Sequence, residues 1–346
     1  MTVGGVVRAI IAHCLYVTGL LDRLANFRLR NRTVVLMYHR VLTDRELPAS
    51  FSSSGIVVND KTFERHMRYL RKHFHVIGLE DLVRHFEKGQ PSENRSCLIT
   101  FDDGWKDNCS NAFRILSENS IPALIFLTTA FIDSDRRFWQ DRLAEGLHTL
   151  RRRAAAGDVI SMDEHLSRDE RIQRIIRCRP ENLDRVIADI ITELKESSLD
   201  EIEKFIAAVS HGQSPGSKEN SDGPMFMNWD DVLRMEAAGI QFGSHGHSHC
   251  ILPRAEMNIA RKELEQSKSI MEAKLGKEVS AFSYPNGDFN EEVVGMVRDS
   301  GYRIAFGTEN GRVSWQDNPY KLKRVNVHED MTRSIPMFLA RIVGLW

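Results

Sequence analysis

The chain has 346 residues, of which 42% are hydrophobic and 27% charged, and its formal net charge is -1 at pH 7. This length allows one large domain or one domain with an insertion, and the composition is ordinary for a globular protein. The balanced charge excludes a globally basic nucleic-acid-binding protein, so we expect no nucleic-acid partner. Five cysteines without a C-x-x-C motif exclude a disulfide framework and a cysteine zinc site, and they favour a reducing, cytoplasmic compartment.

Residues 1–31 are expected to form an N-terminal helix. The stretch "VGGVVRAIIAHCLYVTGLL" is apolar but contains Arg8 and His13, and the arginine-rich "DRLANFRLRNR" follows it. We expect neither a signal peptide nor a membrane-spanning helix, because the basic leading region and the necessary apolar length are missing. The segment either packs on the domain or makes peripheral contact with an anionic membrane through residues 5–32, which would place the protein at the inner face of the cell membrane.

Strand-like and helical patterns alternate along most of the chain. Apolar, β-branched runs occupy residues 33–39, 75–79, 96–101, 122–128, 239–244, 279–285, 302–307 and 323–328, and helical patterns follow at 60–74, 79–89, 108–120, 256–276 and 290–301. This alternation predicts an α/β protein with a largely parallel sheet. Eight strands over this length favour a distorted or incomplete (β/α) barrel. A doubly wound sheet is the alternative, although no G-x-G-x-x-G follows the first strand.

Residues 139–225 interrupt the alternation. Charged helical patterns fill 138–157, 169–178 and 181–210, and "HGQSPGSKENSDGP" reads as a flexible loop. We therefore expect a barrel made of residues 32–138 and 226–346, with a helical insertion that is either a lid, a partner surface or a solvated excursion.

Polar side chains follow several of the predicted strands. "LITFDDG" ends on Asp102 and Asp103, "GIQFGSHGHSH" ends on His245, His247 and His249, and "VVLMYH" ends on His39. The carboxyl ends of parallel strands meet at one edge of the sheet, so these groups should gather there.

A metal ion explains this grouping. His245 and His249 are four residues apart and face the same side of a helical turn, and with one carboxylate they form a triad that leaves coordination positions open. One aspartate can then bind the cation while the other, kept ionised, acts as base towards metal-bound water. His247, two residues from each histidine ligand, should point elsewhere.

The motifs "TFDDG" and "SHGHSH" resemble the first two motifs of the polysaccharide deacetylases, the NodB-homology enzymes. These are metal-dependent hydrolases on a distorted (β/α) barrel that remove N-acetyl groups from amino sugars. The likeness covers residues 34–139 and 227–327, and "YHRV" is similar to the start of the exopolysaccharide-type branch. The resemblance implies an N-acetylated amino-sugar saccharide as substrate and a divalent ion, zinc first, with nickel, cobalt or iron as alternatives.

Carried over onto this chain, the resemblance implies that Asp102 is the catalytic base. It implies that Asp103, His245 and His249 bind the metal ion. Gly246 departs from the pattern, because serine or threonine is usual there.

The general acid of the family is a histidine at the end of a strand, and two residues compete for this role. The exopolysaccharide-type branch favours His39, whereas His328 ends the last predicted strand beside two acidic residues. Ser283 stands where many members carry an arginine that braces the base. Another cation must replace that arginine, or the base is held differently.

We therefore expect hydrolysis of an N-acetyl amide on a polysaccharide or lipid-linked saccharide. Metal-bound water would attack the amide with Asp102 as base, and His39 would protonate the leaving amine. A non-catalytic carbohydrate-binding or scaffold protein on the same fold is one alternative, mildly favoured by Ser283. A non-haem iron oxygenase is another, but its acid normally lies two residues after the first histidine. The sequence does not indicate the oligomeric state.

Overall fold

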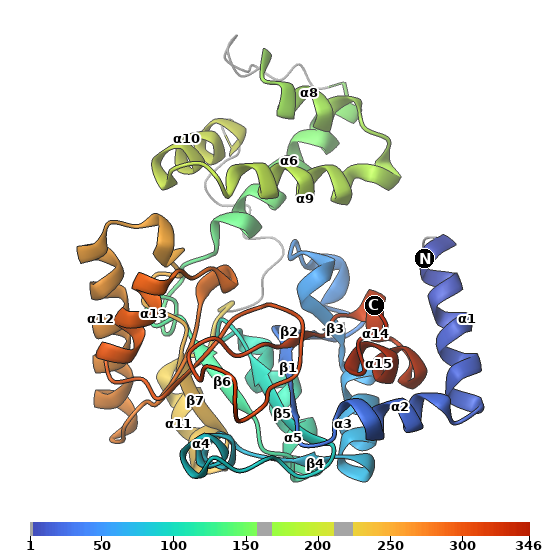
Figure 1. Cartoon of the computed structure of the whole chain (residues 1–346). Helices are drawn as coiled ribbons and strands as arrows, with labels where there is room; N and C mark the ends of the chain where they lie inside the picture. Colours follow the sequence, from blue (N-terminus) through green and yellow to red (C-terminus); the bar gives the residue numbers. More distant parts are fainter. Residues whose placement is uncertain (1–2, 158–167, 211–223) are drawn as a thin grey trace. The chain divides into compact units, whose positions relative to one another are not determined.

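The computed structural model describes residues 3–157, 168–210 and 224–346, which fall into two compact units (Figure 1). The barrel unit comprises Met1–Leu47, Ser54–Asp135 and Pro224–Trp346, and the helical unit comprises Pro48–Ser53 and Arg136–Gly223. The flexible loop expected over residues 211–224 lies outside the described residues except for its last position. The barrel unit contains every described strand, and it carries all of the predicted site residues.

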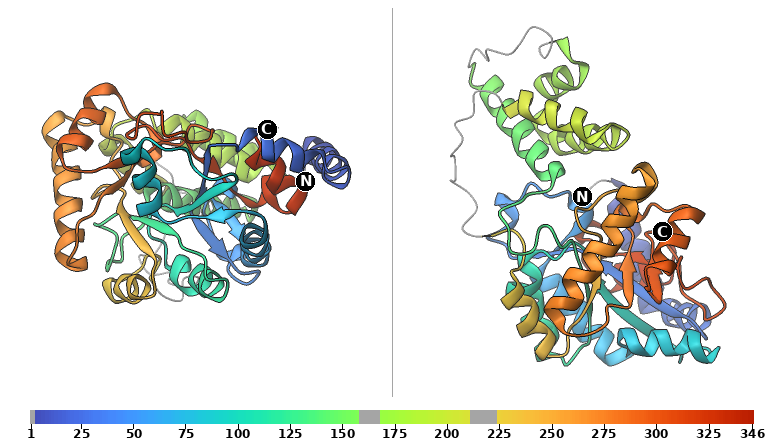
Figure 2. Two further views of the ribbon diagram at one scale, coloured as in Figure 1. Left: turned by 60° about the horizontal axis from the view of Figure 1, so that its bottom comes forward. Right: turned by 90° about the vertical axis from the view of Figure 1, so that its left-hand side faces the viewer.

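The strands of the barrel unit form one curled parallel sheet (Figure 2). They are β1 Thr33–Tyr38, β4 His75–Val76, β5 Ser96–Phe101, β6 Leu124–Leu127, β7 Gln241–Ser244, β8 Ala281–Ser283, β9 Ile304–Phe306 and β10 Val325–Asn326. Their order is β10-β1-β5-β6-β7-β8-β9, with β4 beside β5. A separate two-stranded sheet pairs β2 Arg40–Leu42 with β3 Val57–Asn59.

The sheet curls into a distorted barrel, in which β9 at one edge is hydrogen-bonded to the segment just before β10 at the other edge. Leu322, just before β10, donates from its N–H to the Ala305 carbonyl of β9 at 2.9 Å, while β10 itself pairs with β1. All residues of β1 and β5 are buried, which explains why these strands read as continuous apolar runs. The predicted α/β half-barrel is confirmed, and the doubly wound alternative is wrong.

Helices follow most strands. They are α3 Asp60–His73, α4 Leu79–Lys88, α5 Phe113–Glu118 (preceded by a π-helical turn, Asn108–Ala112), α11 Trp229–Ala237, α12 Met257–Leu275, α13 Glu291–Asp299, α14 Glu329–Thr332 and α15 Ile335–Ile342. Five of them, α3, α4, α5, α12 and α13, lie at the positions that their sequence patterns predict. Asn59, Asn228 and Asn290 start three of the helices, each accepting a hydrogen bond from a backbone N–H of the first turn. Short 3₁₀ turns occur at Leu47–Ala49, Ser54–Ile56, Leu252–Arg254 and Pro285–Gly287.

Two helices precede the barrel, α1 Val3–Val17 and α2 Leu20–Arg28. Their inner residues Ala12, Leu21 and Ala25 are buried in the main core of the barrel unit. The guanidinium group of Arg28 donates to the carbonyl of Val343 at 2.6 Å, just after α15. The N-terminal segment thus packs on the domain. Among the described helices, none alone has the length and apolar composition of a membrane span, although α1 and α2 meet that test together as a pair bent by 87°.

The helical unit has its own hydrophobic core. It contains α6 Trp139–Ala155, α8 Glu170–Arg177, a 3₁₀ turn Pro180–Asn182, α9 Leu183–Leu194 and α10 Leu199–Ser210. Residues from all four helices are buried together, including Leu147, Ile172, Ile190 and Phe205. A core of this kind is what a separately folding subdomain requires.

Candidate metal centre and active site

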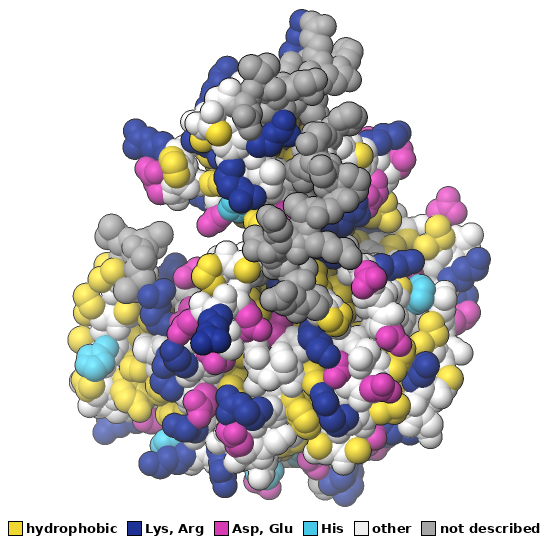
Figure 3. All heavy atoms as spheres, turned by 180° about the vertical axis from the view of Figure 1, so that it is seen from behind, with side chains coloured by type: hydrophobic (Ala, Val, Ile, Leu, Met, Phe, Trp, Pro, Cys, Tyr) yellow, Lys and Arg dark blue, Asp and Glu magenta, His cyan; other side chains and the backbone are white. Residues whose placement is uncertain are grey.

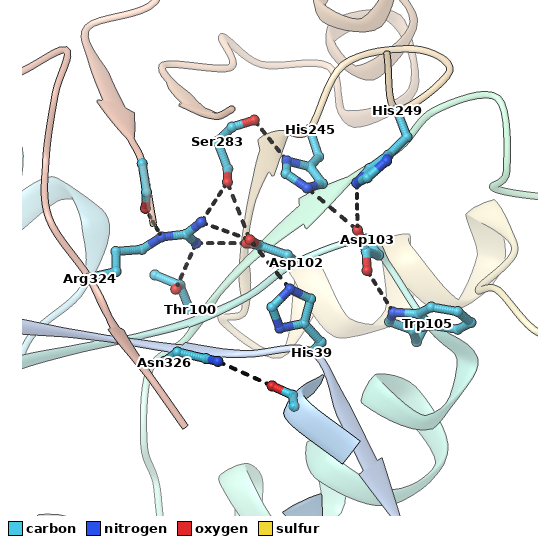
Figure 4. A network of polar contacts seen from close by, with 12 residues as sticks. His39, Thr100, Asp102, Asp103, Trp105, His245, His249, Ser283, Arg324 and Asn326 are labelled. Atoms are coloured by element: carbon cyan, nitrogen blue, oxygen red, sulfur yellow. Dashed lines mark hydrogen bonds and ion pairs between the residues drawn. The ribbon is translucent and has the colours of Figure 1, made fainter. Parts of the chain in front are cut away.

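The structure brings Asp103, His245 and His249 together at the carboxyl ends of β5 and β7 (Figure 4). The Oδ1 atom of Asp103 lies 3.4 Å from Nε2 of His245 and 3.4 Å from Nε2 of His249. All three ligand atoms lie within 4.8 Å of one another. A tetrahedral ion bound about 2.1 Å from each ligand requires separations of roughly 3.4 Å, so the spacing suits such an ion.

The burial of Asp103 also fits a cation. Its side chain is 7% exposed, and Oδ1 has no hydrogen-bond partner among the described residues. A buried carboxylate oxygen without a partner costs several kcal/mol, whereas a coordinated one does not. Two imidazole nitrogens and one carboxylate oxygen form a donor set typical of zinc and neighbouring transition metals.

His245 is oriented for metal binding by a backbone carbonyl. Its Nδ1 lies 2.7 Å from the carbonyl oxygen of Ser283, which can only accept, so Nδ1 carries the proton and Nε2 faces Asp103 as a free acceptor. Burial lowers the pKa of His245 to about 4, which keeps the ring neutral at physiological pH. A neutral imidazole with a fixed tautomer is the form that binds a metal.

The turn after β5 holds Asp103 in an unusual backbone conformation. Its φ is +77° and that of Gly104 is +83°. A Cβ atom at Gly104 would lie 2.9 Å from the Leu127 side chain, so only glycine fits this position. The indole N–H of Trp105 donates to Oδ2 of Asp103 at 2.9 Å. One carboxylate oxygen is therefore fixed by the protein and the other is left for the ion.

A buried glutamate from α12 organises the loop that carries His249. One carboxylate oxygen of Glu263 accepts from the backbone N–H groups of His247 and Ser248 at 2.8 and 2.7 Å. Gly246 has a φ of +78° in this loop, and a Cβ atom there would approach the same oxygen to 3.3 Å. This explains why glycine replaces the serine or threonine usual at this position. His247 points elsewhere, with Nδ1 2.9 Å from the Thr129 hydroxyl.

Asp102 is bound by a buried arginine, Arg324, that our sequence reasoning missed. Two guanidinium nitrogens of Arg324 donate to the two carboxylate oxygens of Asp102 at 2.7 Å each, and the side chains are 0% and 2% exposed. Burial alone would raise the pKa of Asp102, but the charge of Arg324 and its hydrogen bonds lead the opposing contributions, which hold the pKa below its ordinary value. Asp102 is thus ionised at neutral pH.

Arg324 also answers the question that Ser283 raises. One nitrogen of Arg324 donates to Ser283 Oγ at 2.9 Å, and Nε donates to the Gly307 carbonyl at 2.8 Å. The cation that holds the Asp102 carboxylate therefore comes from Arg324, the residue before β10, and it also contacts Ser283. A sequence signal was present, because an arginine inside the predicted apolar strand 323–328 must find a buried acidic partner.

The structure separates the two candidates for the general acid. Nε2 of His39 lies 3.9 Å from Oδ2 of Asp102, and the ring is 15% exposed. His328 lies at the start of α14, where burial lowers its pKa and its charged neighbours are Asp330 and Arg341. The Asn108 side chain donates to the His39 carbonyl at 2.7 Å and fixes that end of β1. The geometry favours His39.

Comparison with known proteins gives the family. The model of the polysaccharide deacetylase family matches residues 89–170 and 205–305, together more than half of the chain. The chain belongs to the polysaccharide deacetylase family. It is therefore a hydrolase that acts on amide carbon–nitrogen bonds. The match includes the Asp102 to Asp103 pair and the His245 to His249 loop, whereas His39 and Arg324 lie outside it.

Relatives of this deacetylase include exopolysaccharide-type enzymes. Poly-beta-1,6-N-acetyl-D-glucosamine N-deacetylase of Staphylococcus aureus is 22% identical over 308 residues, which are 87% of this chain and 80% of the relative. IcaB of Ammonifex degensii has a TM-score of 0.57 at 16% identity, covering 92% of this chain and all of its own. The Streptococcus pyogenes deacetylase PplD, solved with acetate, has a TM-score of 0.56 at 15% identity and coverage of 87% and 95%.

Both alternatives to the predicted function lose their support. An iron oxygenase does not agree with the family match. The scaffold alternative depended on the missing arginine at position 283, and Arg324 supplies an equivalent charge to Asp102. The family match and the arginine beside Asp102 therefore favour the deacetylase over both alternatives.

Proposed function

We propose that this deacetylase removes N-acetyl groups from amino-sugar residues of a saccharide, either a poly-β-1,6-N-acetylglucosamine-type polymer or a lipid-linked precursor. One observation carries the proposal. The cluster of Asp103, His245 and His249 lies beside an ionised Asp102 and a partly exposed His39. The S. aureus relative, named for its action on poly-beta-1,6-N-acetyl-D-glucosamine, supports this substrate class.

We infer that a divalent ion, zinc first, binds Oδ1 of Asp103 and Nε2 of both histidines. When bound, such an ion lowers the pKa of a water molecule and polarises an acyl oxygen. The deprotonated Asp102 is the base that takes the proton of the attacking water, and the guanidinium group of Arg324 fixes its position. Each Asp102 oxygen accepts one hydrogen bond from Arg324 at 2.7 Å, and a carboxylate oxygen has a second lone pair with which it can accept that proton.

His39 completes the reaction by proton donation. The water oxygen forms a bond to the acetyl carbon, the bond from that carbon to nitrogen breaks, and the sugar nitrogen receives a proton from His39. The products are acetate and a free amino sugar. A ring that is 15% exposed and 3.9 Å from the base can reach both the substrate and the solvent that reprotonates it.

A direct assay tests this function. Purified full-length protein is incubated with zinc and either poly-β-1,6-N-acetylglucosamine oligomers or lipid-linked N-acetylglucosamine, and acetate and free amine are quantified. We expect equal amounts of acetate and amine. Each event should lower the mass of the saccharide by 42 Da, because a hydrogen atom replaces an acetyl group. A chelator should inhibit the reaction, and added zinc should reverse the inhibition. No acetate from any N-acetylated saccharide would overturn the proposal.

The His39→Gln variant tests the general acid. We expect turnover to fall about 10²- to 10⁴-fold with metal content unchanged, because the variant loses proton donation and keeps the metal ligands. His328→Gln is the matched control, since it removes a half-buried histidine at the next strand end, and it should keep turnover within about threefold. Equal losses in both variants, or a loss only in His328→Gln, would contradict the assignment.

A further inference from the structure

The N-terminal helices expose an apolar surface that the barrel core does not use. Within the described residues, eleven large hydrophobic side chains are exposed, and seven of them lie between residues 6 and 27. We call these seven the N-terminal apolar face. Their side chains are between 41% and 80% exposed, and they are Val6, Val7, Ile10, Ile11, Val17, Leu20 and Phe27. Figure 3 shows hydrophobic side chains gathered over this part of the barrel unit at the left edge. Apolar patches of this kind mark interaction sites.

The helical period explains how α1 acquires two apolar faces. Its inner face is made of Ala9, Ala12 and Tyr16, which pack against the core. Val7, Ile10 and Ile11 recur at intervals of three and four residues and are 49%, 59% and 45% exposed. The spacing places them on the side of α1 opposite Ala12. A helix held on its inner face and apolar on its outer face is fixed in place and still has a surface to bury.

The helices that carry the N-terminal apolar face are rich in arginine. Residues 1–32 contain five arginines and one acidic residue, Asp22, whereas the whole chain has a formal charge of -1. Asp22 is paired with Arg95 at 3.0 Å. Burial lowers the pKa of Arg312, and the nearby charges of Arg28 and Arg32 lower it further, so guanidinium groups crowd at this end of the barrel unit. Arginines on the same helices as an exposed apolar face are complementary to anionic headgroups above an acyl layer.

We propose that the N-terminal apolar face binds the surface of an anionic lipid bilayer. The aliphatic side chains and Phe27 enter the boundary between headgroups and acyl chains, and exposed arginines such as Arg23 and Arg30 contact lipid phosphates. A second copy of the chain fits less well, because it would bring two sets of arginines together. A spanning arrangement would require α1 and α2 to leave the core in which Ala12, Leu21 and Ala25 are buried.

Vesicle co-sedimentation with the full-length protein tests this proposal. Vesicles of phosphatidylcholine with 30% phosphatidylglycerol are compared with pure phosphatidylcholine, at low and high salt. We expect binding to the anionic vesicles at low salt and at least tenfold weaker binding to the neutral ones. Ile10→Gln/Ile11→Gln should weaken binding at least tenfold, and Arg23→Gln/Arg30→Gln about fivefold for each arginine removed.

A matched control separates a specific face from general hydrophobicity. Met257→Gln/Ile259→Gln removes two side chains of α12 that are 40% and 46% exposed, and it should bind like the unaltered protein. Thermal unfolding of each variant checks that the fold is kept. No binding to anionic vesicles, or equal loss in both apolar double variants, would overturn the proposal. A dimer in solution that Ile10→Gln/Ile11→Gln dissociates would also overturn it. Acetate release from a soluble oligomer is independent of every one of these results.

Discussion

Replacing Arg324 by methionine is expected to lower the free energy of unfolding by about 3–5 kcal/mol and to reduce turnover at least about 100-fold. The substitution leaves the Asp102 carboxylate buried without the two hydrogen bonds of 2.7 Å that it receives from the guanidinium group. Methionine has a similar volume, so the loss reports the charge and the hydrogen bonds more than a cavity.

The sign of the accompanying pH effect follows from burial. In the unaltered protein the charge and hydrogen bonds of Arg324 hold the pKa of Asp102 low. The carboxylate is therefore ionised, and its contribution to stability is lost only as the pH falls to acidic values. Without Arg324, less positive charge opposes the effect of burial, so the pKa of Asp102 rises. Residual activity of Arg324→Met should therefore shift towards higher pH.

Chemical denaturation and acetate release measure both effects. Arg303→Met is the matched control, because it removes an exposed ion pair with Glu87 and should change stability by no more than about 1 kcal/mol. The double variant Asp102→Asn/Arg324→Met should recover part of the lost stability and none of the activity, since no uncompensated charge remains buried. Normal stability together with normal turnover in Arg324→Met would contradict the role that we assign to this arginine.

The barrel could be predicted from the sequence because its longest strands, β1 and β5, are buried on both faces. Val34, Leu36, Leu98 and Ile99 lie in strands without an exposed position, so each strand is a continuous apolar run. The short pair β2 and β3 was missed, because Arg40–Leu42 and Val57–Asn59 contain three residues each and show no period. The helices that the sequence analysis predicted were recognisable from their apolar spacing.

The predicted metal ligands and the predicted base lie next to recognisable strand ends, whereas the sequence does not specify which partner each buried positioning residue contacts. Arg324 is 222 positions from Asp102, and its contact with the aspartate depends on β10 pairing with β1, which no local pattern specifies. Glu263 lies on α12 in a helical stretch full of charged residues, so nothing in the sequence distinguishes it from its exposed neighbour Glu265. Positioning residues of this kind are selected by three-dimensional contacts.

The N-terminal segment shows the limit of composition arguments. Its apolar content predicted either packing on the domain or contact with a membrane, and only some of its apolar side chains are buried in the structure. Ala12 and Ala25 pack inward, whereas Ile10 and Phe27 are 59% and 80% exposed. The two expectations therefore concern different faces of the same helices.

The second large effect is expected at the two adjacent aspartates, which we assign to different tasks. Asp103→Asn should weaken metal binding at least about 100-fold, because the neutral amide replaces the charged ligand whose Oδ1 faces both histidines at 3.4 Å. Asp102→Asn should keep the metal ion and lose turnover at least about 100-fold, because a carboxamide cannot accept the proton of water. His247→Gln is the control, since His247 lies between the two histidine ligands in sequence and contacts Thr129 instead.

The most direct measurement is the zinc content of these three variants and the unaltered protein after dialysis, determined by plasma mass spectrometry beside their acetate release. The account predicts one ion per chain in the unaltered protein, in Asp102→Asn and in His247→Gln, and almost none in Asp103→Asn. Full zinc occupancy in Asp103→Asn, or full acetate release by Asp102→Asn, would contradict it.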